Sequence, residues 1–396
     1  MAMTATLCSS CFRDPFLKAF IDEKGTDDSC SFGCTGSKAL PLTMIADVIG
    51  DALSKHYSPV DTSHDEIEVG EDPVDLLLRL TGLEHPQAKA VVEYLRNREI
   101  RTHGSDQFFG SDLTFRTPWP FGQENRWQDF KQRVKFEARF LDPAAKYILD
   151  ELSRDLPDFA RGVAVSALPA GTRVYRARIG QTSEDATRII EAGLPELGPP
   201  TTSQAHPGRM NAAGISVFYG AIEPDVAIAE VKPWVGAWVA VATFEATRDV
   251  RVLDLARIPS ADQCESVFAP GFAALSQRIG FFRSFEYEIA EAVQPGQELI
   301  EYVPTQVVAE YVARTLELDG IIYRSAQTDE VGKRNVVLFP RNQVTESEDT
   351  TAVLRFPLKF VDGLSELRRV TGISVRSAGE IIWSRYVDLP PQDSEE

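Results

Sequence analysis

The chain has 396 residues, which suits two or three domains, and its 43% hydrophobic content can fill sizeable cores. This composition excludes a disordered chain, a collagen and a coiled-coil rod, and no apolar run is long enough to span a bilayer. A net charge of −18 repels nucleic acid over most of the surface, so we expect no direct nucleic-acid binding. The start lacks the basic and apolar regions of a signal peptide, so we expect a soluble, cytoplasmic protein without membrane contact.

Four of the five cysteines lie within the first 34 residues, in two close pairs, Cys8 with Cys11 and Cys30 with Cys34. Thiolates from two tight turns can close a tetrahedral site, so the spacing predicts a structural zinc ion. Unligated cysteines in a small fold are the alternative. A catalytic zinc is not expected, because four protein thiolates leave no open coordination position. We assign residues 1–40 to a zinc-knuckle-like segment.

Residues 41–158 show apolar side chains at helical spacing and are expected to form an all-helical domain. Helices are predicted over 41–57, 73–80 and 86–95. A further amphipathic helix is predicted from the spacing of Trp127, Phe130, Val134, Ala138 and Leu141. Another begins at Asp142-Pro143, where an N-cap residue precedes a first-turn proline, and runs to about Leu152.

After residue 160 the pattern changes to short apolar runs alternating with short helices, which predicts a mixed α/β domain over 159–345. Strands are expected at 173–178, 215–219, 237–244, 250–255, 320–323 and 335–338, and helices at 225–231, 272–279 and 304–316. Strand-like runs at 352–360 and 381–387 and a polar, disordered tail make up residues 346–396. The overall fold class is α+β.

Two groups of residues are candidates for chemistry. Arg96 and Arg98 precede His103 near a predicted helix end, a loose pattern that fits a ribonuclease or, equally, a solvated helix terminus. The α/β domain holds the larger group, which is spread over strands, a glycine-bounded loop and a helix: Arg176, Arg209, Asn211, Tyr219, Glu230 and Ser325. Asn335 opens the last strand of this domain and belongs to the same group. Taken singly, each of these could be an ordinary surface or core residue.

Several blocks of this domain, in order, resemble the RES domain: VYRAR, GRMNAAGISVFYGAIEPDVAIAEVKP, YVPTQVVAEYV, LDGIIYRSA and NVVLF. The resemblance covers about residues 165–345. It implies a fold like that of ADP-ribosyltransferases and a bacterial toxin that consumes NAD+, with a helix-turn-helix antitoxin as partner. The N-terminal region further resembles the HEPN-like domain found in front of some RES domains. The sequence departs from the family at Met210, where tryptophan is frequent, and by an insertion around 181–206.

The resemblance implies roles for the candidate residues. Arg176 and Arg209 would bind the pyrophosphate of NAD+ through their planar guanidinium groups. Glu230 would stabilise the oxocarbenium-like transition state at the ribose. Tyr219 would offer an aromatic face to nicotinamide, Ser325 would bind a phosphate or the ribose, and Asn211 would shape the loop or donate to the ligand. Glu230, Arg176 and Ser325 form the expected catalytic set.

We therefore expect an enzyme that cleaves the nicotinamide–ribose bond of NAD+, with water, inorganic phosphate or a protein side chain as acceptor. The three acceptors correspond to a glycohydrolase, a phosphorylase and an ADP-ribosyltransferase. Two alternatives remain open at this point: a HEPN-type ribonuclease, and a non-catalytic module that senses a nucleotide. The N-terminal region is a candidate for target recognition or for dimerisation, which would give a homo-oligomer.

Overall fold

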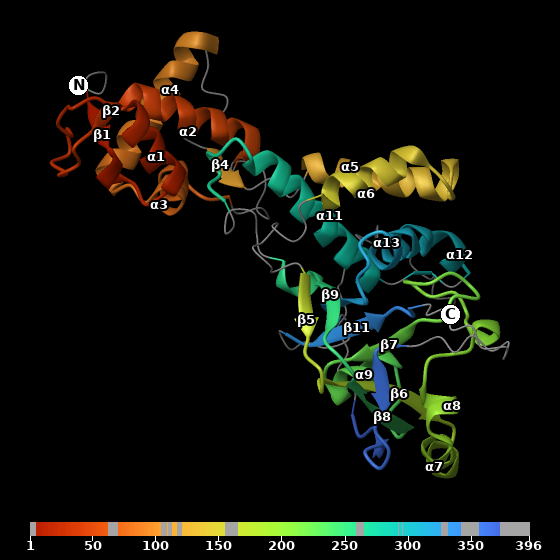
Figure 1. Ribbon diagram of the computed structural model, residues 1–396. Coiled ribbons are helices and arrows are strands. Elements are labelled where there is room, and N and C mark those ends of the chain that lie inside the picture. The colour runs from red at the N-terminus through yellow and green to blue at the C-terminus, as the bar shows by residue number, and fades with distance from the viewer. Residues whose placement is uncertain are drawn as a thin grey trace, which may run out of the picture.

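The computed structural model describes residues 5–61, 70–103, 109, 113–116, 121–154, 165–258, 265–291, 293–294, 296–325, 332–341 and 356–372. These residues form two bodies, which we call the N-terminal body (5–116) and the C-terminal body (121–372). The long helix α11, Phe272–Ala290, runs from one body into the other (Figure 1). Within the described part of the chain, no helix is long and apolar enough to cross a membrane.

The N-terminal body is built mainly of helices and carries two small sheets. Its helices are α1 (Pro15–Lys24), α2 (Leu42–His56), α3 (Pro73–Thr81) and α4 (His85–His103). Strands β1 (Thr6–Cys8) and β2 (Ala39–Pro41) pair antiparallel, as do β3 (Ser58–Asp61) and β4 (Leu113–Arg116). The predicted helices at 41–57 and 73–80 are confirmed, and α4 extends beyond the predicted 86–95. The two sheets and α1 were not predicted.

The core of this body follows from the spacing of apolar residues along its helices. Helix α2 buries Ile45, Ile49 and Leu53 at intervals of four residues, so they form one stripe on one face. That stripe belongs to the same cluster as Val91 and Leu95 of α4. The N-terminal end of α11 joins this cluster, where the Phe272 ring meets the His56 ring edge-on.

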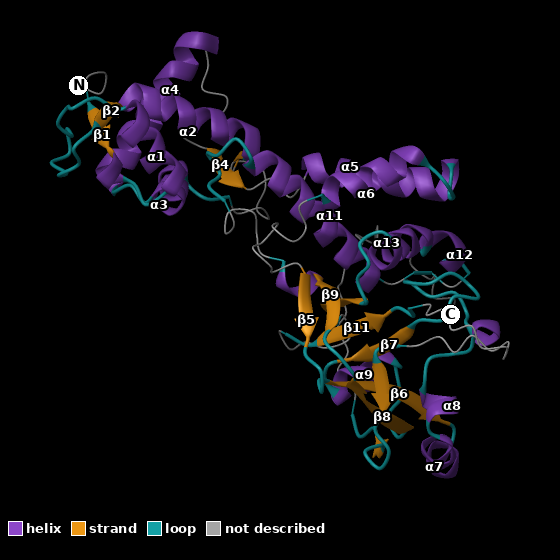
Figure 2. Cartoon of the chain, viewed as in Figure 1, coloured by secondary structure: helices purple, strands orange, loops and turns teal. Residues whose placement is uncertain are grey.

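The next two helices, α5 (Phe121–Gln132) and α6 (Pro143–Ser153), share a hydrophobic core with the C-terminal body, although their sequence fell within the predicted helical domain. The Trp127 ring packs against Phe281 and Phe285 of α11, with ring centroids 5.1 and 6.0 Å away. Figure 2 shows both helices alongside the α11 end that reaches the sheet. We therefore propose that the C-terminal unit begins before α5, earlier in the chain than the predicted boundary near 158.

The predicted helix through Leu141 ends earlier than expected. After α5 the chain makes a π-helical turn at Arg133–Glu137, and Leu141 is fully exposed with a φ of 57°. The cause is Asp142, which accepts a hydrogen bond from Arg133 at 3.0 Å and another from the backbone N–H of Ala144 at 2.9 Å. Asp142 thus caps α6, as predicted, and the chain must turn away from α5 to place it there.

The C-terminal body is organised around a nine-stranded sheet. Its strands are β5 (Val165–Leu168), β6 (Arg173–Gly180), β7 (Phe218–Ala221), β8 (Trp238–Ala246), β9 (Val250–Asp254), β10 (Gly320–Arg324), β11 (Arg334–Leu338), β12 (Leu358–Phe360) and β13 (Glu366–Arg369). The order is β12-β8-β6-β7-β11-β10-β9-β5. β12 and β13 both pair with β8, β12 near its C-terminal end and β13 near its N-terminal end. The six strands predicted before residue 345 are confirmed with small shifts, β12 lies in the predicted run 352–360, and the run 381–387 lies outside the described residues.

Helices cover both faces of the sheet. On one face lie α9 (Pro224–Glu230), α11 and α13 (Val303–Arg314). On the other lie α7 (Ser183–Ala192) and α8 (Leu194–Leu197), which form the predicted insertion around 181–206. Ile189 and Leu197 are buried against the strands, so the insertion covers the sheet through packed helices. A short helix, α12 (Glu298–Glu301), precedes α13.

Candidate active site

Two residues from separate parts of the C-terminal body donate hydrogen bonds to one carboxylate, that of Glu230. Glu230 ends α9, Ser325 follows β10, and Asn335 lies in β11, which pairs antiparallel with β10. The Ser325 hydroxyl donates to Oε1 of Glu230 at 2.8 Å, and Nδ2 of Asn335 donates to the same oxygen at 2.7 Å. The structure thus brings Glu230 together with Ser325 and with Asn335, to which the sequence analysis assigned no role.

The Glu230 carboxylate remains accessible. Its side chain is exposed, and within the described residues no cation forms an ion pair with it. In particular, the nearby Lys232 does not pair with it. Both hydrogen bonds that described residues make to this carboxylate go to Oε1, so among these residues none donates to the second carboxylate oxygen.

The loop from Gly208 to Gly214 is held by its own side chains. The buried Asn211 donates through Nδ2 to the carbonyls of His206 and Ile215, at 2.9 and 3.0 Å. Its Oδ1 accepts from the Tyr219 hydroxyl at 2.8 Å, and that hydroxyl accepts from the Met210 backbone N–H at 3.0 Å. Asn211 and the Tyr219 hydroxyl are therefore engaged in shaping the loop.

Gly208 is required at the start of this loop because a Cβ there would lie 2.7 Å from both the Tyr219 hydroxyl and Oδ1 of Asn211. Helix α13 fixes the loop from the other side. Gln306 donates to the carbonyls of Gly208 and Asn211 at 2.8 and 2.9 Å, and the buried Thr305 donates to the Arg209 carbonyl at 2.5 Å. Arg209 is thus presented from a rigid backbone.

The Arg209 guanidinium is turned toward the end of α11. It donates to the backbone carbonyls of Glu288, at 3.2 Å, and Glu291, and it lies over the Tyr302 ring at 5.1 Å from the centroid. A cation at the carbonyl end of a helix is favourable. Arg209 therefore has a structural contact in addition to its predicted role toward phosphate.

Arg176 occupies a different environment. Its neighbour on β6, Tyr175, packs under α9, so alternation along the strand sends Arg176 to the opposite face, where it lies over the Phe218 ring at 5.6 Å. Its Nη1 is buried, and no described residue forms a hydrogen bond with it. Burial, together with the neighbouring Arg178, lowers the pKa of Arg176 to about 10, so it stays charged at neutral pH. A desolvated, unpaired guanidinium is a strong candidate to bind an anion.

Two tyrosines lie close enough to the arginines and to Glu230 for these charges to affect the pKa values of the tyrosines. Burial raises the pKa of Tyr219, and the charges of both Arg209 and Arg176 act on it in the opposite direction. Burial also raises the pKa of Tyr323, which lies opposite Asn335 in the sheet, and the Glu230 charge adds to this effect. Both phenols are therefore neutral, and Tyr219 lies within electrostatic reach of both predicted arginines.

An apolar cavity of about 240 Å³ lies behind the loop rather than at Glu230. It is lined by Met210, Asn211 and residues of α13, and neither Glu230, Ser325, Asn335 nor Arg176 contributes to it. Met210 is almost fully buried in the core there. The residue at which the sequence departs from the family pattern thus packs away from the carboxylate.

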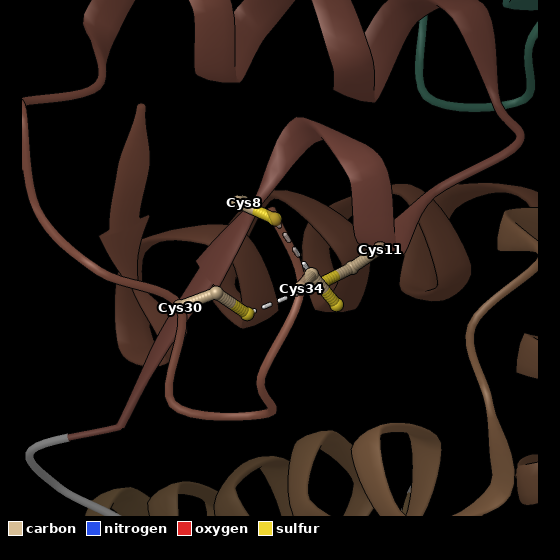
Figure 3. Close-up of side chains that lie close together, drawn as sticks. All are labelled: Cys8, Cys11, Cys30 and Cys34. Atoms are coloured by element: carbon tan, nitrogen blue, oxygen red, sulfur yellow. Dashed lines mark hydrogen bonds between the residues drawn. The ribbon is translucent and has the colours of Figure 1, made fainter. Parts of the chain in front are cut away.

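The four N-terminal cysteines form a compact cluster (Figure 3). Cys8 and Cys11 come from β1 and the turn after it, Cys30 and Cys34 from the loop that leads to β2, and their sulfur atoms all lie within 4.8 Å of one another. Sγ of Cys11 is 3.7, 3.4 and 3.4 Å from those of Cys8, Cys30 and Cys34. Tetrahedral zinc thiolates, with bonds of about 2.3 Å, place sulfur atoms about 3.8 Å apart. The cluster therefore fits a zinc ion.

The electrostatics of the cluster agree with this geometry. Burial raises the pKa of the Cys11 thiol far above its usual range, and the neighbouring thiols add to the effect. Four charged thiolates at such distances would repel one another strongly unless a cation lay between them. No catalytic position is left, because all four sulfur atoms would be ligands.

The arginines of the ribonuclease alternative have structural partners. Arg98 pairs with Asp47 at 2.7 Å, and Arg96 donates to the Phe109 carbonyl at 2.7 Å. The side chain of His103 lies outside the described residues. The structure therefore gives both arginines a structural role, and it does not test the predicted grouping with His103.

Comparison with known proteins bears on the C-terminal body. The chain matches the family model of the RES domain over residues 173–359. No curated protein matches the chain. The crystal structure of the M. tuberculosis MbcT-MbcA toxin-antitoxin complex contains a chain with 13% identity, covering 56% of this chain and 93% of that one. Its TM-score of 0.29 is too low to support an argument about structure. The blocks recognised in the sequence and the family match coincide, so the chain carries a RES domain at residues 173–359.

Proposed function

We propose that the RES domain cleaves NAD+ at the bond between nicotinamide and ribose, with Glu230 as the catalytic carboxylate. The observation that carries the proposal is the exposed Glu230, whose Oε1 is held by Ser325 and Asn335 and which forms no ion pair with a described residue. A carboxylate whose charge is not neutralised by a neighbour is suited to stabilise a developing positive charge. Residues that only support the fold have no need of this arrangement.

In the proposed reaction, the bond between C1′ of the ribose and the nicotinamide nitrogen breaks, and its electron pair leaves with neutral nicotinamide. The positive charge that develops on the ribose is stabilised by Glu230, whose free oxygen also accepts a hydrogen bond from a ribose hydroxyl. An acceptor then forms a new bond to C1′. Water would give ADP-ribose, inorganic phosphate a phosphorylated ADP-ribose, and a protein nucleophile an ADP-ribosylated product.

Arg176 supplies the proposed contact to the pyrophosphate. Its buried, unpartnered N–H can donate to a phosphate oxygen, which would offset the cost of keeping the charge desolvated. β6 and β7 are joined by a single pair, Tyr175 with Ala221, next to Arg176. The proposal places NAD+ across the point where these strands part, with Arg209 and the Tyr219 ring on the same side as Glu230.

We further propose that the protein acts as a toxin restrained by an antitoxin, in keeping with the resemblance to RES toxins. The cysteine cluster would hold a structural zinc ion, and the N-terminal body would serve target recognition or self-association. Neither role requires the N-terminal body to contribute to the chemistry.

The proposal is tested by incubating the purified full-length protein with NAD+ and, separately, with RNA. We expect release of nicotinamide and intact RNA, and mass spectrometry of the products with and without phosphate identifies the acceptor. Degraded RNA with intact NAD+ would contradict the proposal and favour the ribonuclease alternative.

A further inference from the structure

We infer that Asn335 is a positioning residue of the reaction, which together with Ser325 holds the Glu230 carboxylate so that one oxygen is fixed and the other faces the substrate. The inference rests on the proposed function, because it assigns Asn335 a role through Glu230. It also changes the role expected for Ser325, which would orient the carboxylate instead of binding phosphate.

The geometry of the two donors supports this role. The Ser325 hydroxyl reaches Oε1 from the residue after β10, and Nδ2 of Asn335 reaches it from β11, at 2.8 and 2.7 Å. Glu230 lies at the last turn of a seven-residue helix, and an exposed glutamate there would otherwise sample several rotamers. Two charge-assisted hydrogen bonds to one oxygen restrict that freedom, and they leave Oε2 to meet a ribose hydroxyl.

The burial of Asn335 separates a functional role from a structural one. Asn335 is 2% exposed and begins a run of buried aliphatic residues in β11, Val336 to Leu338. Its Oδ1 is buried and has no hydrogen-bond partner among the described residues, which destabilises the fold. Fold stability alone would favour an aliphatic residue at this position. Asn335 lowers the stability of the fold but makes a hydrogen bond to a candidate catalytic group. We expect such a residue where activity, and not stability, determines which amino acid is retained.

This reasoning gives opposite signs for stability and activity in Asn335→Leu. Leucine has the same branched arrangement of side-chain heavy atoms as asparagine but lacks both the donor and the unpaired oxygen. We expect the thermal midpoint to stay unchanged or rise, because Glu230 is exposed and water can replace the lost donor. We expect kcat for nicotinamide release to fall about 10- to 100-fold, the effect of losing one hydrogen bond to a charged group, with KM changed less than about threefold.

Thr243→Val is the matched control. Thr243, on β8, is also a buried polar residue of the sheet, and its hydroxyl donates a hydrogen bond to the Leu364 carbonyl at 3.0 Å. Its substitution should leave kcat unchanged. Asn335→Ala provides a second variant if leucine does not fit, and it should show the same loss of kcat with a lower thermal midpoint because it leaves a cavity.

A double-mutant cycle then tests whether Asn335 acts through Glu230. In the Glu230→Gln background, Asn335→Leu should cause no further loss of kcat, whereas independent roles would give additive losses. Two results would overturn the inference while the proposed function stands. One is that the wild type and Asn335→Leu release nicotinamide at the same rate. The other is that the losses of kcat in the two single variants add in the double variant. A wild-type protein that releases no nicotinamide would instead refute the proposed function.

Discussion

Replacing Arg176 with methionine should stabilise the free protein and weaken its binding of NAD+. The pKa of Arg176 falls from 12.5 to about 10 through burial, so the folded state holds this proton less tightly than the unfolded chain. The charged group therefore opposes folding at every pH below about 10. A pKa difference of one corresponds to about 1.4 kcal/mol, so the charged Arg176 lowers the free energy of unfolding by roughly 3 kcal/mol. Solvent screening of a half-buried residue and the lost contact with Phe218 reduce the expected gain to about 1–2 kcal/mol.

Thermal unfolding with and without NAD+ measures both effects. We expect the midpoint of the free variant to rise by a few degrees, since about 1 kcal/mol shifts a domain of this size by roughly 2–4 °C. We expect NAD+ affinity to fall at least about tenfold, the scale of a lost hydrogen bond to a charged group. Arg188→Met is the control, because Arg188 is exposed on α7, pairs with Asp185 and Glu196 and should affect neither quantity much. A lower midpoint with unchanged affinity would show that Arg176 supports the fold and does not contact the ligand.

Three further predictions concern the rest of the molecule. Elemental analysis of protein purified without chelator should find one zinc per chain, and the double substitution Cys8→Ser with Cys11→Ser should remove it and loosen the N-terminal body while NAD+ cleavage persists; wild-type protein without zinc would contradict this. A fragment that begins at residue 121 should unfold cooperatively, whereas one that begins at 159 should aggregate, because it exposes the faces of Phe281 and Phe285 that Trp127 covers; equal solubility would contradict the shared core. Arg209→Lys should lower both thermal stability and NAD+ affinity, since lysine cannot reproduce the contacts to the end of α11; calorimetric titration that finds unchanged affinity would remove Arg209 from the site.

Local pattern was sufficient to predict most elements of this chain. Residues close together in the sequence are enough to predict three kinds of feature: the apolar stripe of α2, the Asp142-Pro143 start of α6 and the short apolar runs of the sheet. Strands β3 and β4 were missed because each is only four residues long and they pair across more than fifty residues, as in Ser58 with Arg116. Their stability depends on a partner that local sequence does not reveal.

The attachment of α5 and α6 to the C-terminal body was unpredictable for a related reason. An apolar stripe such as Trp127, Phe130 and Val134 shows that a helix is buried on one side but does not say against which partner. The early end of the helix was equally hidden, because it depends on the hydrogen bonds that Asp142 makes with Arg133 and with the start of α6.

The candidate site was predictable as a set of residues but not as an arrangement. The resemblance supplied Glu230 and Ser325, and the structure shows that they share a hydrogen bond. Asn335 was noted as the polar residue that opens an otherwise aliphatic strand, but its bond to Glu230 is visible only in the folded chain. The opposite faces taken by Arg176 and Tyr175, and the contact of Arg209 with α11, depend on strand register and on helix ends that meet only in the folded chain.

The rate of nicotinamide release by Glu230→Gln, measured against wild type at saturating NAD+, tests the central claim most directly. Glutamine keeps the shape and an oxygen that Ser325 and Asn335 can still bond, but it removes the negative charge. Loss of such electrostatic stabilisation commonly lowers kcat by about 10²–10³, so we expect a variant that folds and binds NAD+ but turns over at that reduced rate. Equal rates in a variant shown to be folded would contradict the proposed mechanism.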